Sequence, residues 1–205
     1  MIYELCCLVN SDATEAELSK VNEIISSSVK DFSAELVLED NWGVKTLAQP
    51  TSSGKTRANF QYFVYKAENA DLNKEILRRL KISDHVMKYG IFSLGDDSKT
   101  ADVLKNFKTP FSKKYNGSIT DQEGEESEGG KRRFTRGKSC WFTARQLKSD
   151  WKDPNTYSWL VNEFGKILPA RVSGVSRKHQ RYVTTAIKRA RNLGVLSHIS
   201  NKTLD

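Results

Sequence analysis

The stretch Ile2-Tyr-Glu-Leu-Cys-Cys-Leu-Val9 decides how the first half of the chain folds. It is rich in residues that favour strands and contains no turn residue, so it predicts a β-strand. A helix over residues 13–32 should follow, with Asp12 or Thr14 as its cap. The evidence for this helix is a set of apolar residues at spacings of three and four: Leu18, Val21, Ile25, Val29 and Phe32.

Strand and helix signals continue to alternate through residue 95. The first is an interrupted strand at Glu35–Leu38 and Val44–Ala48, broken around Asn41–Gly43, and a turn at Gln49–Gly54 follows it. A strand at Phe60–Tyr65 comes next. The last two elements are a helix with Leu72, Ile76 and Leu80 on one face and Asn69 or Asp71 as its cap, and a strand at Val86–Leu94. The order β-α-β-β-α-β predicts a ferredoxin-like domain over residues 1–95, with both helices on one face of an antiparallel sheet. The other face must then be polar or be covered by a partner.

The rest of the chain changes character twice. Residues 96–130 are dense in charge and end in an acidic run, which predicts a flexible linker, with room for a short helix at Ala101–Phe107. Residues 131–205 predict a small, mainly α-helical, basic domain, so the fold class is α+β. Its expected parts are a basic arm at Lys131–Lys138, a helix at Pro154–Phe164 capped by Asp153, an extended segment at Lys166–Pro169, and a helix at Arg177–Leu193 between Ser176 and Gly194.

Positive charge is confined to the last part of the chain. Residues 131–205 contain 17 Lys and Arg against 4 Asp and Glu, whereas residues 1–95 contain 11 against 13. A field of one sign and this density repels itself unless an anionic partner neutralises it. Nucleic acid is the usual partner of such a region, and an anionic membrane surface is the rarer one.

Six basic residues share one face of the helix expected at Arg177–Leu193, opposite its apolar face: Arg177, Lys178, Arg181, Lys188, Arg189 and Arg191. A solvated basic face is the plain alternative. Against it, the face holds no acidic residue for pairing along the helix, and Arg177 and Lys178 lie in the first turn, where the helix dipole disfavours cations. Phosphate is therefore the preferred partner. The arm adds five further candidates for RNA contact: Arg132, Arg133, Phe134, Arg136 and Lys138.

Motifs for catalysis or metal binding are not found in the sequence. The three histidines lack metal-ligand spacing, and His179 falls on the apolar face of its helix, where packing is the better interpretation. Cys140 is followed at the third position by Thr143 rather than by a second cysteine, so a zinc site is not expected. The adjacent Cys6 and Cys7 would point to opposite sides of a strand, which fits a reducing compartment. No apolar run approaches the length that spans a bilayer. Neither catalytic residues nor a cofactor are expected.

The residues also carry a resemblance to known families. Residues 139–199 resemble the bacterial-type small-subunit ribosomal protein eighteen in an ordered set of stretches: Phe142–Ala144, Gly165–Pro169, Arg171–Gly174, Lys178–Arg181 and Ala186–Arg191. Residues 1–95 resemble small-subunit ribosomal protein six at Tyr3–Leu5, Leu38–Gly43 and Lys45–Ala48. The resemblance implies a fusion of the two, with the first over residues 131–200, the second over residues 1–95, and residues 96–130 as linker.

These families are known as partners on the platform of the small subunit, where they bind the central domain of its rRNA. The resemblance therefore implies a structural, non-enzymatic, ribosome-associated protein of the cytoplasm, with a bacterial and an organellar ribosome both left open and with no membrane partner. It also implies that the two domains pair within the chain beside other platform proteins. It assigns rRNA contact to the arm and helix residues named above and to Lys166 and Arg171, and it assigns domain or RNA contact to Trp42 and Lys45. Some members bind zinc through a cysteine at the position of Thr143, and this chain should not.

Two other functions stay open from the sequence. The basic surface could regulate translation by binding an mRNA leader. The split βαβ domain could be an enzyme, since that fold also hosts hydrolases, although no residue in it pairs a nucleophile with a base.

Overall fold

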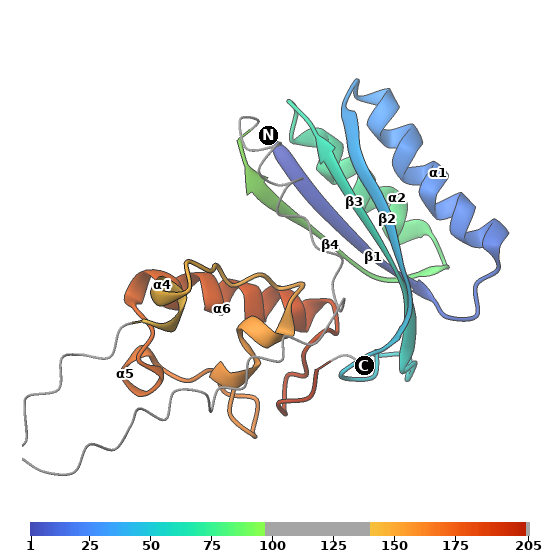
Figure 1. Ribbon diagram of the computed structural model, residues 1–205. Coiled ribbons are helices and arrows are strands. Elements are labelled where there is room, and N and C mark those ends of the chain that lie inside the picture. Colours follow the sequence, from blue (N-terminus) through green and yellow to red (C-terminus); the bar gives the residue numbers. More distant parts are fainter. Residues whose placement is uncertain (97–139, 204–205) are drawn as a thin grey trace, which may run out of the picture.

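The computed structural model describes residues 1–96 and 140–203, and Figure 1 shows them as a sheet domain and a smaller helical domain. The sheet domain consists of β1 (Ile2–Asn10), α1 (Glu15–Asp31), β2 (Glu35–Thr46), β3 (Arg57–Lys66), α2 (Asp71–Ile82) and β4 (Val86–Gly95). The expected helix at Ala101–Phe107, nearly all of the linker and the basic arm lie outside the described residues.

The sheet has the order β2-β3-β1-β4, and every neighbouring pair is antiparallel. Helices α1 and α2 both lie on one face of it (Figure 1). This arrangement confirms the ferredoxin-like prediction. The pairing places Leu5 of β1 opposite Phe63 of β3 and Ile91 of β4, so the odd-numbered residues of β1 face the helices.

Helix α1 begins as predicted, with Thr14 as its cap. The Thr14 backbone N–H donates to Glu17 Oε2 at 2.8 Å, and Thr14 Oγ1 accepts from the Glu17 N–H at 3.4 Å. This reciprocal pair satisfies donors that the first turn of a helix leaves free. The helix then buries Val21, Ile25 and Val29 against the sheet.

Strand β2 differs from the prediction, because it continues through the expected break. The register shifts between Leu36 and Leu38 and again between Asn41 and Gly43, so the extra residues form bulges in an unbroken strand. Gly43 has a φ of +74°, and its N–H donates to Asn41 Oδ1 at 2.9 Å. The Asn-Trp-Gly sequence thus marks a bulge that buries Trp42 and not the end of pairing.

The helical domain consists of α4 (Trp141–Ala144), η2 (Pro154–Thr156), η3 (Ser158–Leu160), α5 (Ala170–Ser173) and α6 (Arg177–Asn192). The predicted α-helix at Pro154–Phe164 is wrong, because two short 3₁₀ helices stand there, followed by a bridge between Val161 and Ile167. Pro154, Tyr157 and Leu160 are all buried, and their spacing of three fits three residues per turn. Asp153 does cap the start, since its Oδ1 accepts from the Asn155 N–H at 3.1 Å.

Helix α6 matches its prediction to within one residue. Ser176 caps it by accepting from the His179 N–H, and Gly194 follows its end with a φ of +71°. Val183, Ala186, Ile187 and Ala190 form its buried side.

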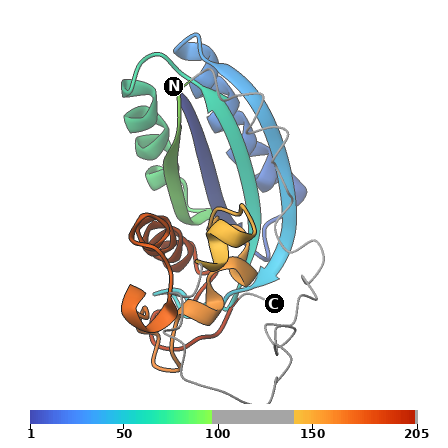
Figure 2. The same ribbon diagram turned by 60° about the vertical axis from the view of Figure 1, so that its left-hand side comes forward.

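Two apolar cores lie on opposite sides of the sheet. One joins α1 and α2 to the sheet through Leu5, Cys7 and Phe63. The other joins Cys6, Leu8, Phe60 and Tyr62 on the opposite face to buried residues of the helical domain. Figures 1 and 2 show this domain at one end of the sheet, with α1 and α2 on the side away from it. Within the described ranges, no helix has the length and apolar character to cross a membrane.

Candidate nucleic-acid interface and the domain contact behind it

Glu4 is the polar centre of the contact between the two domains. It lies in β1 with 1% of its surface exposed and points to the face that the helical domain covers. Its carboxylate accepts from Tyr62 Oη and Trp151 Nε1, both at 2.8 Å, and from Lys152 Nζ at 3.0 Å. Arg189 Nη1 lies 3.7 Å from Glu4 Oε1. A buried carboxylate is tolerated only when it is paired and hydrogen-bonded, and the helical domain supplies three of these four groups.

The charges around Glu4 are consistent with an ion pair. Lys152 is 9% exposed and also lies 3.1 Å from Asp150 Oδ2. Burial alone would lower the pKa of Lys152, but the carboxylates of Asp150 and Glu4 outweigh it and raise that pKa. Burial and the Glu4 charge together raise the pKa of Tyr62, which keeps the phenol neutral as a donor.

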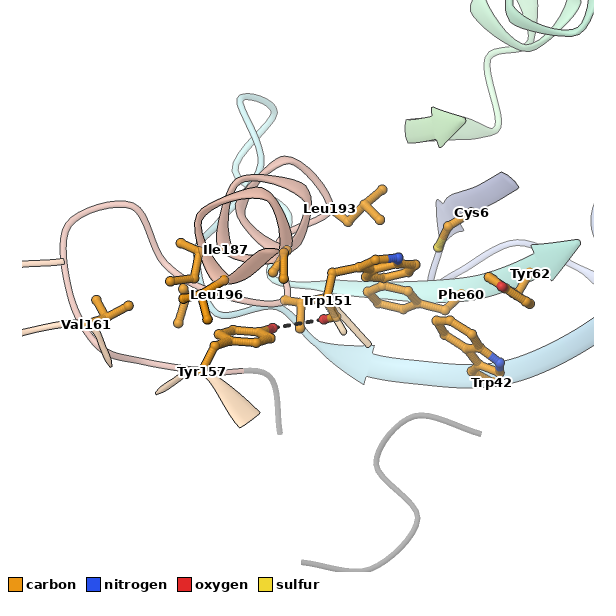
Figure 3. Packing of buried hydrophobic residues seen from close by; sticks show 14 of the residues in the cluster. Cys6, Trp42, Phe60, Tyr62, Trp151, Tyr157, Val161, Ile187, Leu193 and Leu196 are labelled. Atoms are coloured by element: carbon orange, nitrogen blue, oxygen red, sulfur yellow. Dashed lines mark hydrogen bonds between the residues drawn. The ribbon is translucent and has the colours of Figure 1, made fainter. Parts of the chain in front are cut away.

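Trp151 is the apolar centre of the same contact. Its ring lies 6.0 Å from Trp42 and 5.9 Å from Phe92, measured between centroids, and 1% of the residue is exposed. Figure 3 shows it between Phe60 of the sheet and Tyr157 of its own domain, whose hydroxyl donates to the Trp151 carbonyl at 2.8 Å. A tryptophan with both its ring and its N–H engaged is typical of the residues that dominate interface energies.

A second contact joins the turn after β2 to the end of α6. The Ala48 N–H donates to the Gly194 carbonyl at 2.9 Å, and the His198 N–H donates to Gln49 Oε1 at 3.1 Å. A Cβ at Gly194 would lie 3.2 Å from Leu47 Cδ2. Glycine is therefore favoured at position 194 by the left-handed backbone, and a Cβ there would press on the Leu47 side chain.

The outer side of α6 carries a basic surface, which we define as the exposed residues Arg177, Lys178, Arg181 and Lys188. The first three line a shallow hollow together with Tyr182, which is 45% exposed. Within residues 1–96 and 140–203, none of these four cations forms an ion pair. Lys166 and Arg171 are exposed on the preceding segments of the same domain.

Two of the six basic residues predicted on this face are placed elsewhere. The Arg189 guanidinium lies 4.7 Å above the centre of the Phe92 ring, beside Glu4, at the domain contact. Arg191 Nη2 donates to the Gly165 carbonyl, and burial lowers the pKa of Arg191. On a helical projection both stand at the borders of the basic sector, next to the apolar side, and this position was the signal that separates them from the other four.

The remaining predicted residues divide in the same way. Trp42 lies in the domain contact, stacked on Tyr62 at 4.8 Å, and Lys45 is half-buried in β2. The arm residues Arg132, Arg133, Phe134, Arg136 and Lys138 lie outside the described ranges. The sequence reasoning missed Glu4, Trp151 and Lys152. Glu4 offered a signal, because it is the one charged residue inside an apolar strand.

His179 is packed, with its ring stacked on Phe142 at 5.5 Å. Its Nδ1 lies 3.0 Å from Ser176 Oγ and 3.4 Å from Cys140 Sγ. Among the residues that the structure describes, no group of three or more His, Cys, Asp or Glu is placed to hold a metal ion.

Comparison with known proteins adds a family to each domain. Residues 2–93 match the family described as ribosomal protein S6, and residues 145–196 match the family described as ribosomal protein S18. Small ribosomal subunit protein bS18 of Geotalea uraniireducens (strain Rf4) is 52% identical over 67 residues, which are 32% of this chain and 74% of the relative. The bS18 of Treponema denticola is 42% identical over 81 residues, 40% of this chain and 90% of the relative.

The crystal structure of 30S ribosomal protein S6 from Thermotoga maritima aligns with 51% of this chain and 96% of its own, at 12% identity and a TM-score of 0.45. Proteins of the two matching families are structural and non-enzymatic. The chain therefore belongs to the ribosomal protein S18 family and carries a ribosomal protein S6 domain ahead of it, as a fusion of two small-subunit ribosomal proteins.

Proposed function

We propose that this protein binds the central domain of small-subunit rRNA, at the platform, through the basic surface of α6 with Lys166 and Arg171 beside it. The observation that supports the proposal best is that four exposed cations share one helix side and lack ionic partners in the described chain. Such a group lowers its own repulsion when phosphates approach, and it releases condensed counterions from the RNA.

The hollow on α6 favours RNA over a simple polyanion. Arg177, Lys178 and Arg181 surround the partly exposed ring of Tyr182. Guanidinium groups suit phosphate oxygens, and an aromatic ring offers a platform on which an unpaired base can stack. The combination suits the loops and bulges of a folded RNA better than a regular duplex.

The sheet domain contributes by holding the basic surface in place. Its contacts through Glu4, Trp42 and Phe92 are directed to the helical domain and leave α6 free on its outer side. Because both domains belong to one chain, their pairing is intramolecular and is favoured by a high effective concentration. We infer that the two domains enter the platform as one unit, next to the neighbouring proteins there.

A salt titration of RNA binding tests the proposal. The protein should bind a central-domain rRNA fragment more tightly than an unrelated hairpin at 150 mM salt, and affinity should fall steeply with salt. In the double variant Arg177→Ala, Arg181→Ala, the slope of log K against log salt should decrease by about 2, one for each lost phosphate contact. The matched control Lys20→Ala, Lys81→Ala removes the same charge from α1 and α2 and should leave the slope unchanged.

Two results would contradict the proposal. One is equal affinity for the fragment and the unrelated hairpin. The other is crosslinking in cells that recovers mainly mRNA leaders and not rRNA, which would assign the basic surface to a regulatory role.

A further inference from the structure

Two large apolar residues of the helical domain meet at its surface, apart from both the domain contact and the basic surface. Phe164 follows η3 and is 74% exposed, and Ile199 lies beyond α6 and is 75% exposed. Their segments adjoin, because a Cβ at Gly165 would collide with the His198 carbonyl oxygen and lie 3.0 Å from the carbonyl carbon of Ile199. We call Phe164 and Ile199 the apolar pair. Single exposed apolar residues are common, but here the fold brings two of them together from separate segments.

The turn that carries Phe164 is held firmly. The Asn162 N–H donates to the Lys166 carbonyl and the Gly165 N–H to the Asn162 carbonyl, both at 2.9 Å. The Lys166 N–H donates to Asn162 Oδ1 at 2.7 Å, and Arg191 Nη2 donates to the Gly165 carbonyl. A side chain displayed on a turn that is already ordered can bind without the entropic cost of fixing its backbone.

The two segments that carry the apolar pair are basic. Lys166 is exposed directly after the turn, and Lys202 is exposed after Ile199. Glu163 is the only acidic residue in residues 161–169 and 195–203. The surroundings of the pair therefore favour an anionic partner.

The sheet domain adds a cation from β4. Lys88 shares a face of β4 with Gly90, and the end of α6 covers that face, since a Cβ at Gly90 would lie 3.4 Å from Leu193 Cδ2. Burial lowers the pKa of His198, and the nearby charges of Arg191 and Lys88 lower it further. Both domains thus direct positive charge toward the segment after α6.

An aromatic ring among cations suits an unpaired nucleobase better than a protein surface. Two apolar side chains cover on the order of 300 Å², whereas a stable protein interface needs about 800 Å² on each partner. The centre of a protein interface is also depleted of lysine, which stands directly beside this pair. A base in a loop or bulge needs only one ring to stack on, and its phosphates match the flanking cations.

We propose, on the basis of the rRNA binding proposed above, that Phe164 stacks on an unpaired base of the bound RNA, with Ile199 beside it and Lys166 and Lys88 near the flanking phosphates. Arg191, which anchors the turn, lies about 13 Å further along the axis of α6 than Tyr182. The RNA therefore contacts the helical domain at both ends of α6 and not at the basic surface alone.

Substitutions at Phe164 test the stacking in the intact chain. Phe164→Ala should weaken binding of the central-domain rRNA fragment about 10-fold, and Phe164→Trp should bind like wild type, because stacking on one ring contributes about that factor. Phe164→Leu keeps an apolar side chain without a ring and should bind like Phe164→Ala. The slope of log K against log salt should match wild type in all three variants, since none removes a cation.

Matched controls separate stacking from a general effect. A regular RNA duplex of the same length offers no unpaired base, so Phe164→Ala should change its affinity by less than about twofold. Ile82→Ala removes a side chain that is 67% exposed on α2 and should leave the binding of both RNAs unchanged. Ultraviolet irradiation of the wild-type complex, followed by mass spectrometry, should place a crosslinked nucleotide on Phe164.

Wild-type affinity of Phe164→Ala for the fragment would overturn the stacking. So would wild-type affinity of Phe164→Leu, which would show an apolar contact that needs no ring. Neither result touches the rRNA binding itself, which is decided by the preference of the wild-type protein for the fragment over the unrelated hairpin. Loss of that preference would refute both.

Discussion

Glu4 shows how one residue couples the two domains. It is a carboxylate in a strand that is otherwise apolar, and its hydrogen bonds are made mainly to Trp151 and Lys152 of the other domain. A charged residue such as Glu4 in an apolar strand indicates that a partner is buried with it. The sequence does not reveal which of the 33 lysines and arginines is that partner. The partner is set by the docking of two domains, which no local pattern encodes.

Removing the ammonium that faces Glu4 should destabilise the protein strongly. Lys152→Met leaves the Glu4 carboxylate buried without its closest cation, a loss of about 3 kcal/mol in the free energy of unfolding measured with urea. The double variant Glu4→Gln, Lys152→Met should recover much of that loss. The control Lys74→Met breaks an exposed pair with Asp71 and should change stability by less than about 1 kcal/mol. Equal effects of Lys152→Met and Lys74→Met would contradict the role given to Glu4.

Gly194 and Gly174 form a natural comparison at the same scale, since both have a φ of +71°. A Cβ at Gly174 meets open space, whereas one at Gly194 approaches Leu47 of the sheet domain. Gly174→Ala should cost about 1 kcal/mol for the left-handed backbone alone, and Gly194→Ala should cost about 1 kcal/mol more. Urea denaturation measures both, and identical losses would show that the contact with Leu47 adjusts freely.

The Cys140 thiol gives stability a pH dependence of known sign. Burial alone would raise its pKa, but hydrogen bonds from Ser176 and Thr143 lower that pKa in the folded protein to about 6, below the value of about 8.5 for an unfolded cysteine. Its contribution is therefore fully present above pH 8.5 and is lost as pH falls toward 6. Thermal melts of wild type and Cys140→Ser should converge as pH is lowered through this window. A difference that grows toward pH 6 would have the wrong sign.

At the scale of elements, periodicity and capping residues were sufficient for α1 and α6, whereas the N-cap of α2 is Ala70, which makes no side-chain cap and lies between the two predicted residues Asn69 and Asp71. Helices α1 and α6 begin at Thr14 and Ser176 because these side chains accept from the first turn, which is a local property. The α-helix prediction for the segment after Asp153 failed because apolar residues three apart fit both an α-helix and a 3₁₀ helix. Tyr157 of this segment is buried and donates to the Trp151 carbonyl, a contact that the local pattern does not encode. The continuity of β2 likewise depends on β3, its pairing partner.

The capping box of α1 provides the test at this scale. Thr14→Ala should lower the free energy of unfolding by about 1 kcal/mol, because the Glu17 N–H in the first turn loses its acceptor, Thr14 Oγ1. Ser19→Ala, one turn later, removes only a hydroxyl bonded to the Glu15 carbonyl and is the control. The Thr14 N–H also lowers the pKa of Glu17, so this contribution is fully present above the ordinary pKa of a glutamate and is lost as pH falls below it, through the lowered value.

For the whole molecule, the helical domain covers the sheet face that β-α-β-β-α-β topology leaves open. The sequence predicted that this face needs cover. The packed interface then shows how the requirement is met, through Trp151 against Trp42 and Phe92. Four of the six cations predicted on one side of α6 are exposed there. Arg189 and Arg191 instead make contacts within the protein, which the charge pattern alone does not reveal.

Cutting the chain between the domains tests whether this contact holds without a covalent link. With a protease site introduced between residues 96 and 140, the cleaved halves should still elute together in size-exclusion chromatography. Glu4→Arg sets a third cation against Lys152 and Arg189 and should separate them after cleavage. Lys20→Glu is an exposed charge change on α1 and serves as the control. Separation of the wild-type halves at micromolar concentration would contradict the described contact.

The sheet face occupied by Trp151 has a consequence for the supply of the two components. Because one chain carries both domains, each round of translation produces the sheet domain and the helical domain in a ratio of one to one. The sheet face is already covered by the helical domain of the same molecule. Dosage control of the pair is thereby built into the polypeptide itself.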